Sequence, residues 1–122
     1  MGKKNEDVKA FLGKGVVFDG KLILNGSVRI DGEFKGEVTG DGTLVVGEGA
    51  NIEADITINN IYIFGTVCGN LEIRETTEIG STGKFAGKLT TSALVVREGA
   101  TIEGDCKMVS KQTDVEKAGR EN

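Results

Sequence analysis

The sequence contains no histidine, tryptophan or proline, and these absences exclude several classes of function. Histidine is the commonest metal ligand and the usual general base near neutral pH, so frequent catalytic arrangements are missing. The net charge of −4 lacks the positive surplus on which nucleic-acid binding depends. No apolar run is long enough for a membrane span, and the polar opening Met1–Asp7 does not fit a signal peptide. We therefore expect a cytoplasmic protein that binds no nucleic acid.

Aromatic residues are also few, with five Phe and one Tyr among 122 residues, whereas glycine occurs 19 times. A chain of this length predicts one domain. A broad core filled by aromatic rings is not available, so a narrow core of stacked Val, Ile and Leu fits the composition better. The glycines lie between aliphatic residues, which indicates repeated tight corners rather than disorder.

Two segments of the chain are nearly the same. Leu44–Ile56 and Leu94–Cys106 lie fifty residues apart and are identical at nine of thirteen positions. The interval between them contains three shorter units, each with the pattern apolar, x, small, x, apolar. Six such units begin at Phe18, Phe34, Ile52, Val67, Phe85 and Ile102, with spacings of 16, 18, 15, 18 and 17 residues.

This repeat predicts an all-β, single-domain parallel β-helix of about six turns, with three short strands in each turn. Alternation along each strand sends the apolar residues inward, and successive turns stack about 4.8 Å apart. We expect the solenoid to span residues 11–108, between flexible tails at 1–10 and 109–122. The small residue of each unit is predicted to form a corner, at Gly20, Gly36, Ala54, Gly69, Gly87 and Gly104.

The register of the repeat also predicts the direction in which the two cysteine side chains point. Cys106 shares the column of Leu71 and Leu89 and is predicted to face the core, whereas Cys68 falls in an outward column. Two thiols that lie several turns apart, one inside and one outside, cannot form an intrachain disulfide.

Several motifs resemble known functional sites but lack the residues that those sites require. The segment Gly80–Phe85 resembles the end of a phosphate-binding loop, but Glu78 replaces the first glycine and Phe85 replaces the Ser or Thr that binds magnesium. Carboxylates such as Glu53 and Asp55 lie at outward positions typical of a solvated face. We therefore predict no nucleotide, cofactor, metal or catalytic site.

The ends of the solenoid are the candidate functional region. An uncovered terminal turn leaves an open strand edge and apolar side chains, and such ends recruit further strands. No capping element is evident at either end, which predicts a homopolymer joined through its terminal turns. The alternative is a monomeric binding module whose tails cover the ends. The predicted contact residues are Phe11, Leu12, Phe18 and Leu22 at one end, and Leu94, Val96, Ile102, Cys106 and Met108 at the other.

The sequence resembles the bactofilin family between residues 12 and 108. The resemblance rests on Leu12–Gly15, Gly26–Gly32, Phe34–Gly36 and Gly99–Met108. It implies a right-handed, three-sided β-helix and nucleotide-independent filaments. It further implies a bacterial cytoskeletal scaffold that supports cell shape or localises cell-wall enzymes and membrane proteins. By the resemblance, Ile102 stands where a large apolar residue supports polymerisation. A membrane contact through the N-terminal tail, at the inner face of the cell membrane, is left open.

Enzymes built on other β-helices are the main rival class. Acyltransferases with hexapeptide repeats use a strict six-residue step and a catalytic histidine, and this chain has neither. Carbohydrate-active β-helices need clustered basic or calcium-binding residues. Ice-binding solenoids need a regular threonine ladder. The irregular spacing and the composition favour a structural protein over all three.

Overall fold

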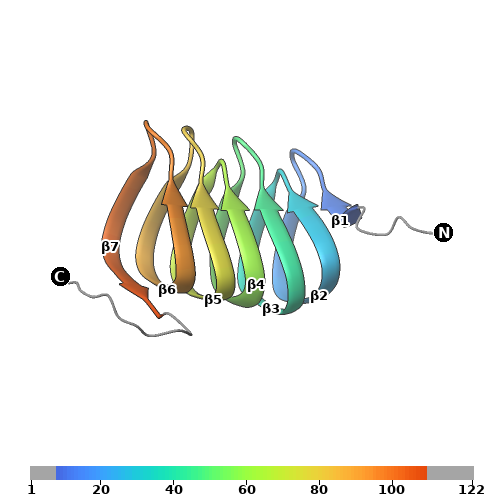
Figure 1. The fold of residues 1–122 in the computed structure, drawn as a ribbon. Helices are drawn as coiled ribbons and strands as arrows, with labels where there is room; N and C mark the ends of the chain where they lie inside the picture. Colours follow the sequence, from blue (N-terminus) through green and yellow to red (C-terminus); the bar gives the residue numbers. More distant parts are fainter. Residues whose placement is uncertain (1–7, 110–122) are drawn as a thin grey trace.

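The structure, a computed structural model, describes residues 8–109 and arranges them as a solenoid of about six turns (Figure 1). Every strand pairs in parallel with the next one along the chain, in one seven-stranded sheet. No helix occurs within these residues. The predicted all-β solenoid is confirmed. The strands are β1 (Val8–Leu12), β2 (Val17–Ile30), β3 (Glu33–Val46), β4 (Asn51–Ile63), β5 (Thr66–Ile79), β6 (Lys84–Val96) and β7 (Thr101–Met108).

The backbone register reproduces the sequence repeat. The first apolar residue of each unit pairs with that of the next, so that Phe18 lies opposite Phe34 and Phe85 opposite Ile102. The rings of Phe18 and Phe34 stack with centroids 5.0 Å apart and planes 5° apart. Because like residues occupy like positions in every turn, the repeat becomes a set of columns parallel to the solenoid axis.

The irregular spacing of the repeat has a simple structural origin. The full turns are strands of 13 or 14 residues, joined by connections of either two or four residues. The shortest spacing, 15 residues, follows the 13-residue strand β4 and its two-residue connection, Phe64–Gly65. A four-residue connection instead closes with a turn, as where Ala50 N–H donates to Gly47 C=O over 3.0 Å. The number of residues per turn varies while the stacking register is kept.

Each turn has three segments, although strand pairing runs through its bends. The first two segments meet at the predicted small residues, and the third lies before the connection to the next turn. Gly36 shows why the first bend needs glycine. Its φ is 135°, and a Cβ atom there would fall on the carbonyl oxygen of Gly20 in the preceding turn. The third segments are residues 27–31, 43–47, 60–64, 76–80 and 93–97.

The core is a narrow column of mainly aliphatic side chains, as the composition predicts, with Phe34 and Phe85 among them. Its residues are fully enclosed in the middle turns and become half-buried toward both ends. The largest fully buried side chains are Phe34, Phe85, Ile30, Leu44, Ile52, Ile56, Ile58, Ile61, Ile63, Leu71, Ile79 and Leu89. Within the described residues, the buried polar side chains are Thr77 and Thr91.

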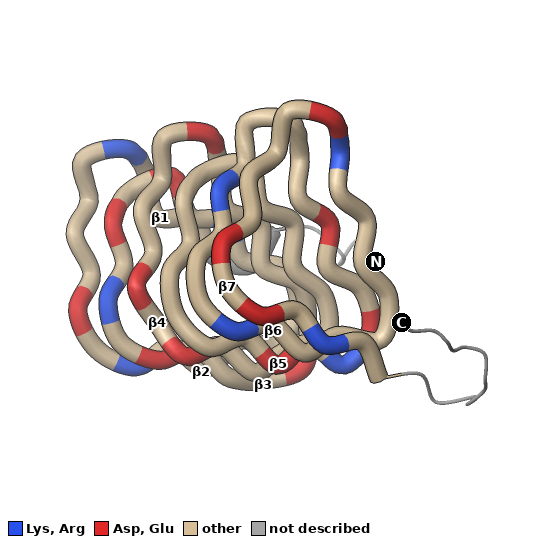
Figure 2. The backbone as a smooth tube through the Cα atoms, turned by 90° about the vertical axis from the view of Figure 1, so that its left-hand side faces the viewer, with Lys and Arg blue, Asp and Glu red and all other residues tan. Residues whose placement is uncertain are grey.

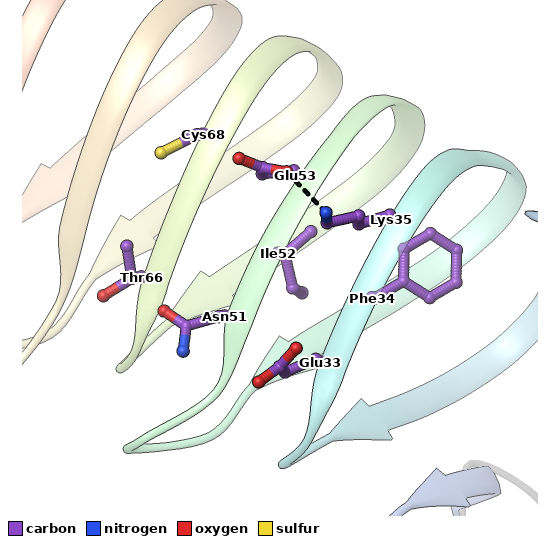
Figure 3. Close-up of a pocket in the computed structure, with 8 residues that line it drawn as sticks. All are labelled: Glu33, Phe34, Lys35, Asn51, Ile52, Glu53, Thr66 and Cys68. Atoms are coloured by element: carbon purple, nitrogen blue, oxygen red, sulfur yellow. Dashed lines mark ion pairs between the residues drawn. The ribbon is translucent and has the colours of Figure 1, made fainter. Parts of the chain in front are cut away.

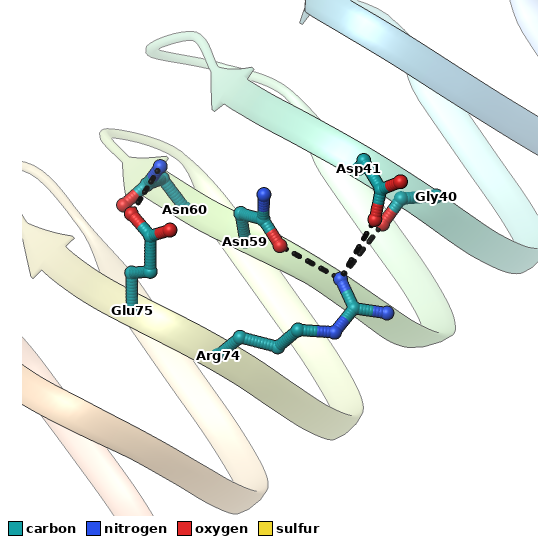
Figure 4. A network of polar contacts seen from close by, with 6 residues as sticks. All are labelled: Gly40, Asp41, Asn59, Asn60, Arg74 and Glu75. Atoms are coloured by element: carbon teal, nitrogen blue, oxygen red, sulfur yellow. Dashed lines mark hydrogen bonds and ion pairs between the residues drawn. The ribbon is translucent and has the colours of Figure 1, made fainter. Parts of the chain in front are cut away.

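Polar groups connect turns on the outside of the solenoid. The Arg74 guanidinium on β5 donates to Asn59 Oδ1 on β4 over 2.7 Å and to Gly40 C=O on β3 over 3.0 Å (Figure 4). It also lies 3.4 Å from a carboxylate oxygen of Asp41. One side chain thus links three successive turns at the bend between the second and third segments. Elsewhere basic and acidic residues are interspersed over the turns (Figure 2).

The solenoid begins slightly earlier than the sequence predicts. Strand β1 starts at Val8, inside the segment expected to be a tail. At the other end, Val109 N–H donates to Thr91 C=O over 2.8 Å, although residue 109 was assigned to the C-terminal tail. The remainder of the two predicted flexible tails, residues 1–7 and 110–122, lies outside the described residues. The described chain includes no helix that is both long and apolar enough to cross a bilayer.

Candidate self-association surfaces

Exposed apolar side chains gather at the two ends of the solenoid. Among the described residues, nine large hydrophobic side chains are exposed, and eight of them belong to the first or last turns. The exception is Phe64, in the connection after β4. The other eight are Phe11, Val16, Val17 and Ile23 at one end, and Val95, Val96, Met108 and Val109 at the other.

The N-terminal end is covered over only part of its turn. Strand β1 pairs with Ser27–Ile30, the third segment of β2. Within the described chain, no strand pairs with Val17–Gly26 on the side away from β3. Leu12 packs against the core, whereas Phe11 next to it is 59% exposed. An open strand edge therefore lies beside apolar side chains at this end.

The C-terminal end is covered over the other two segments of its turn. Strand β7 pairs with Lys84–Thr91, the first and second segments of β6. The third segment of β6, which ends at Val96, has no further strand on it among the described residues. Ile102 lies opposite Phe85 and is half-buried, and Met108 is 57% exposed. This end also combines an open edge with apolar groups.

Cys106 occupies the predicted column, but the prediction that its side chain lies in the core is wrong. Cys106 pairs with Leu89, which is buried, but Cys106 itself is exposed because no described strand stacks on β7. Partial desolvation of the thiol raises its pKa, and the carboxylate of Asp105 adds to the rise. Cys68 is half-buried on an outward position of β5.

The structure divides the predicted contact residues into two groups that it does not bring together. Phe11, Leu12, Phe18 and Leu22 lie at the β1 end, and the other five lie at the β7 end (Figure 1). The sequence reasoning missed five residues that are exposed at the same ends, namely Val16, Val17, Ile23, Val95 and Val109. Their signal was available, because Val17 and Ile23 are apolar at outward positions where most other turns carry polar residues.

A hollow of about 270 Å³ lies on the outer surface across the first segments of β3, β4 and β5. Lys35 and Glu53 form an ion pair of 3.7 Å on its wall, and both side chains are about two-thirds exposed (Figure 3). Thr66 and Cys68 complete its lining on β5. These groups occupy outward columns of the sheet, as expected for a solvated face.

The segment that resembles a phosphate loop forms a connection between turns. Gly83 N–H donates to Gly80 C=O over 2.9 Å, which closes a tight turn between β5 and β6. Phe85 is 2% exposed and lies in the core. The structure thus forms a turn at this segment and places Phe85 in the core, as the repeat predicts for Phe85.

The architecture defines the class of protein as a parallel β-solenoid with apolar terminal turns. The family model described as "Bactofilin: Polymer-forming cytoskeletal" matches residues 10–107, and the chain belongs to this family. The family is one of structural cytoskeletal proteins rather than enzymes.

Two curated relatives come from Myxococcus xanthus (strain DK1622). The chain is 27% identical to bactofilin BacO over 101 residues, which cover 83% of this chain and 80% of BacO. It is 25% identical to bactofilin BacP over 97 residues, which cover 80% of this chain and 40% of BacP. No solved structure matches the chain.

Proposed function

We propose that this protein assembles end to end into filaments, through its terminal turns and without nucleotide. The observation that carries the proposal is the concentration of exposed apolar side chains at the ends, because eight of the nine large ones among the described residues belong to the first or last turns. Contiguous apolar surface on a soluble domain marks a site of association, and a rod with such surfaces at both ends extends linearly. The polymer-forming family to which the chain belongs supports the same function.

The filament would serve as a cytoskeletal scaffold in the bacterial cytoplasm or at the inner face of the cell membrane. Its turns present columns of polar and charged groups along the sides, for example Lys35 opposite Glu53. A rigid rod that repeats such columns offers many identical attachment points along its length. Cell-wall enzymes and membrane proteins are the partners that we propose for it, in support of cell shape.

Negative-stain electron microscopy of the purified chain tests the assembly directly. The experiment uses a series of protein concentrations at low and high salt, without nucleotide or metal. Filaments are expected at both salt concentrations, because apolar contacts are not screened by ions. Uniform single rods at all concentrations would contradict the proposal.

A further inference from the structure

The pair Asn25–Gly26 is the one place in the chain where an asparagine precedes a glycine. Asparagine is a thermolabile residue, because its side-chain amide can be lost as ammonia. The loss begins when the backbone nitrogen of the next residue attacks the side-chain carbonyl carbon. Glycine favours the attack, since it has no Cβ atom to crowd that nitrogen and few restrictions on its backbone angles. The pair is therefore a candidate modification site.

The fold exposes this pair to water. It lies at the bend between the second and third segments of β2, the first full turn. The Asn25 side chain is exposed and points outward, like that of its register partner Asp41 on β3. Gly26 has a φ of 110°, a conformation that residues with a side chain rarely adopt. Solvent thus reaches the side-chain amide directly.

Strand β2 has a neighbour on one side only at this pair. Gly26 pairs with Gly42 of β3, and no described strand lies on the other side of Val17–Gly26. Strand β1 begins to cover that edge at Ser27. Attack by the Gly26 nitrogen requires rotation of the backbone between the two residues. A strand held on both sides resists this rotation, whereas an edge strand permits it through local opening.

The other asparagines of the described chain lack this combination. The side-chain oxygens of Asn59 and Asn60 each accept a hydrogen bond from β5, over 2.7 and 3.2 Å. Asn51 and Asn70 are exposed, but each precedes a bulky apolar residue and lies on a strand with neighbours on both sides. The reaction is therefore expected at one position.

The modification takes place in two steps and consumes only water. In the first step the Gly26 nitrogen loses its proton and bonds to Asn25 Cγ, the bond from Cγ to Nδ2 breaks, and the amide leaves with that proton as ammonia. The product is a cyclic imide. In the second step water adds to one imide carbonyl and a ring C–N bond breaks. Attack at the side-chain carbonyl yields aspartate. Attack at the backbone carbonyl yields isoaspartate, whose main chain runs through the β-carbon.

Either product disturbs the packing of β2 on β3. An aspartate in place of Asn25 puts a carboxylate on the strand next to Asp41, and like charges on neighbouring strands destabilise their pairing. Isoaspartate also lengthens the main chain by one atom. The backbones are already close there, because a Cβ atom on Gly42 would fall on the carbonyl oxygen of Gly26. The extra atom must therefore displace Ser27–Ile30 from their register.

We propose that Asn25–Gly26 is a self-modification site, which deamidates in the unassembled chain and then disables the N-terminal end for assembly. The effect on assembly rests on the proposed end-to-end function, whereas the deamidation itself does not. A copy that stacks on this end covers the open edge of β2 and slows the reaction. Subunits inside a filament thus keep the asparagine, and free chains lose it with time.

Peptide mapping by mass spectrometry tests the chemistry, with the chain kept below the concentration of filament formation. The tryptic peptide Leu22–Arg29 contains Asn25 and no aspartate, so an isoaspartyl methyltransferase labels it only after this reaction. Deamidation of Asn25 should be at least about tenfold faster than that of Asn70, because glycine leaves the attacking nitrogen uncrowded. The rate should rise with pH, because that nitrogen must lose its proton. Equal rates at the two asparagines, or an aged peptide without methyltransferase labelling, would overturn the proposal.

Sedimentation tests the effect on assembly. A partly aged sample is raised above the concentration of filament formation, and the modified fraction of Leu22–Arg29 is measured in pellet and supernatant. Modified chains should be depleted at least about tenfold in the pellet, as expected for a weakened contact. Aged Asn25→Gln, which keeps a polar side chain and reacts far more slowly, is the matched control and should assemble like the fresh chain.

Equal modified fractions in pellet and supernatant would refute the effect on assembly. Asn25→Asp supplies the charge without the additional main-chain atom and should reduce assembly less than ageing does. A fresh chain that forms no filaments would contradict the proposed end-to-end function. The comparison of Asn25 with Asn70 in the single chain would still decide whether the pair modifies itself.

Discussion

The hydroxyl of Thr77 donates a hydrogen bond of 3.1 Å to the hydroxyl of Thr91 inside an otherwise apolar core. The two side chains are 0% and 1% exposed. The Thr91 hydroxyl in turn donates to backbone carbonyls, with Ala93 C=O at 2.9 Å and Glu75 C=O at 3.3 Å. The chain of hydrogen bonds ends on the backbone, so neither hydroxyl is left without a partner.

This direction of donation predicts unequal effects of substitution. Thr77→Val removes a donor and leaves no buried hydroxyl without an acceptor. It should therefore change the free energy of unfolding by less than about 1 kcal/mol. Thr91→Val leaves the Thr77 hydroxyl buried without an acceptor and should cost about 1–3 kcal/mol. The double variant should be more stable than Thr91→Val alone. Urea unfolding in the Ile102→Arg chain measures this without a contribution from filament formation. Equal losses for the two single variants would contradict the assigned direction.

Two glycines of the same column allow the cost of backbone strain to be distinguished from the cost of a clash between turns. Gly20 and Gly36 both have positive φ, 150° and 135°, but only at Gly36 would a Cβ atom strike backbone of the preceding turn. At Gly20 the nearest atom is a ring carbon of Phe18, 3.6 Å away. Gly20→Ala should therefore cost about 1–2 kcal/mol of stability from strain alone.

Gly36→Ala should cost about 2 kcal/mol more, since overpacking adds to the strain. Gly36→Val, with a larger side chain, should destabilise the fold further. Thermal unfolding of the three variants measures the order. A Gly36→Ala chain as stable as Gly20→Ala would mean that the turns can separate at this bend at little cost.

Ile102→Arg tests the C-terminal contact. Ile102 is half-buried in the last described turn, so arginine there brings a charge into an apolar contact while most of the core stays intact. The concentration needed for filament formation, measured by sedimentation, should rise at least about tenfold, which corresponds to 1.4 kcal/mol. Glu103→Arg is the matched control, because its side chain is exposed on the next residue. Filaments of Ile102→Arg at the parental concentration would place the contact elsewhere.

Cys106 reports on the same end without a substitution. Its thiol is exposed in the single chain and should be covered in a filament, so alkylation should slow at least about tenfold on assembly, as expected for a buried thiol. Cys68, on the side of the rod, should keep its rate and serves as the internal control. Mass spectrometry of the two peptides measures both rates. Unchanged alkylation of Cys106 in filaments would exclude it from the contact.

The pH dependence of that reaction follows from the raised pKa of Cys106. The thiolate is the reactive form, and a higher pKa reduces its fraction at neutral pH. In the single chain, alkylation should therefore accelerate about tenfold for each pH unit and continue to rise beyond pH 9.0, the ordinary value for this group. A rate that levels off below pH 8 would contradict the shift.

The columns of the solenoid could be predicted because stacking repeats one environment in every turn. A residue such as Phe34 identifies its neighbours Phe18 and Ile52 through spacing alone, and the structure pairs all three. The bends between the second and third segments were not predictable in this way. Register shifts occur there, as between Ile58 and Asn60, so inward positions of the third segments, such as Thr77, have no constant offset from the start of their units.

Burial at the ends was the other limit of the sequence reasoning. A column defines which way a side chain points, but burial also requires a turn on each side. Cys106 points the same way as Leu89 and is nevertheless exposed, because it stands in the last described turn. The same distinction applies to the candidate contact residues, whose role depends on what covers them.

The offset ends have a mechanical consequence. Strand β1 covers only the third segment of its end, and β7 covers only the first and second segments of the other. Each end is therefore a step rather than a flat disc. Two stepped surfaces fit together at one rotation about the filament axis, whereas two flat apolar surfaces could rotate against each other. A filament joined at such steps would transmit torque along its length, as keyed shafts do, and would resist twisting as well as bending.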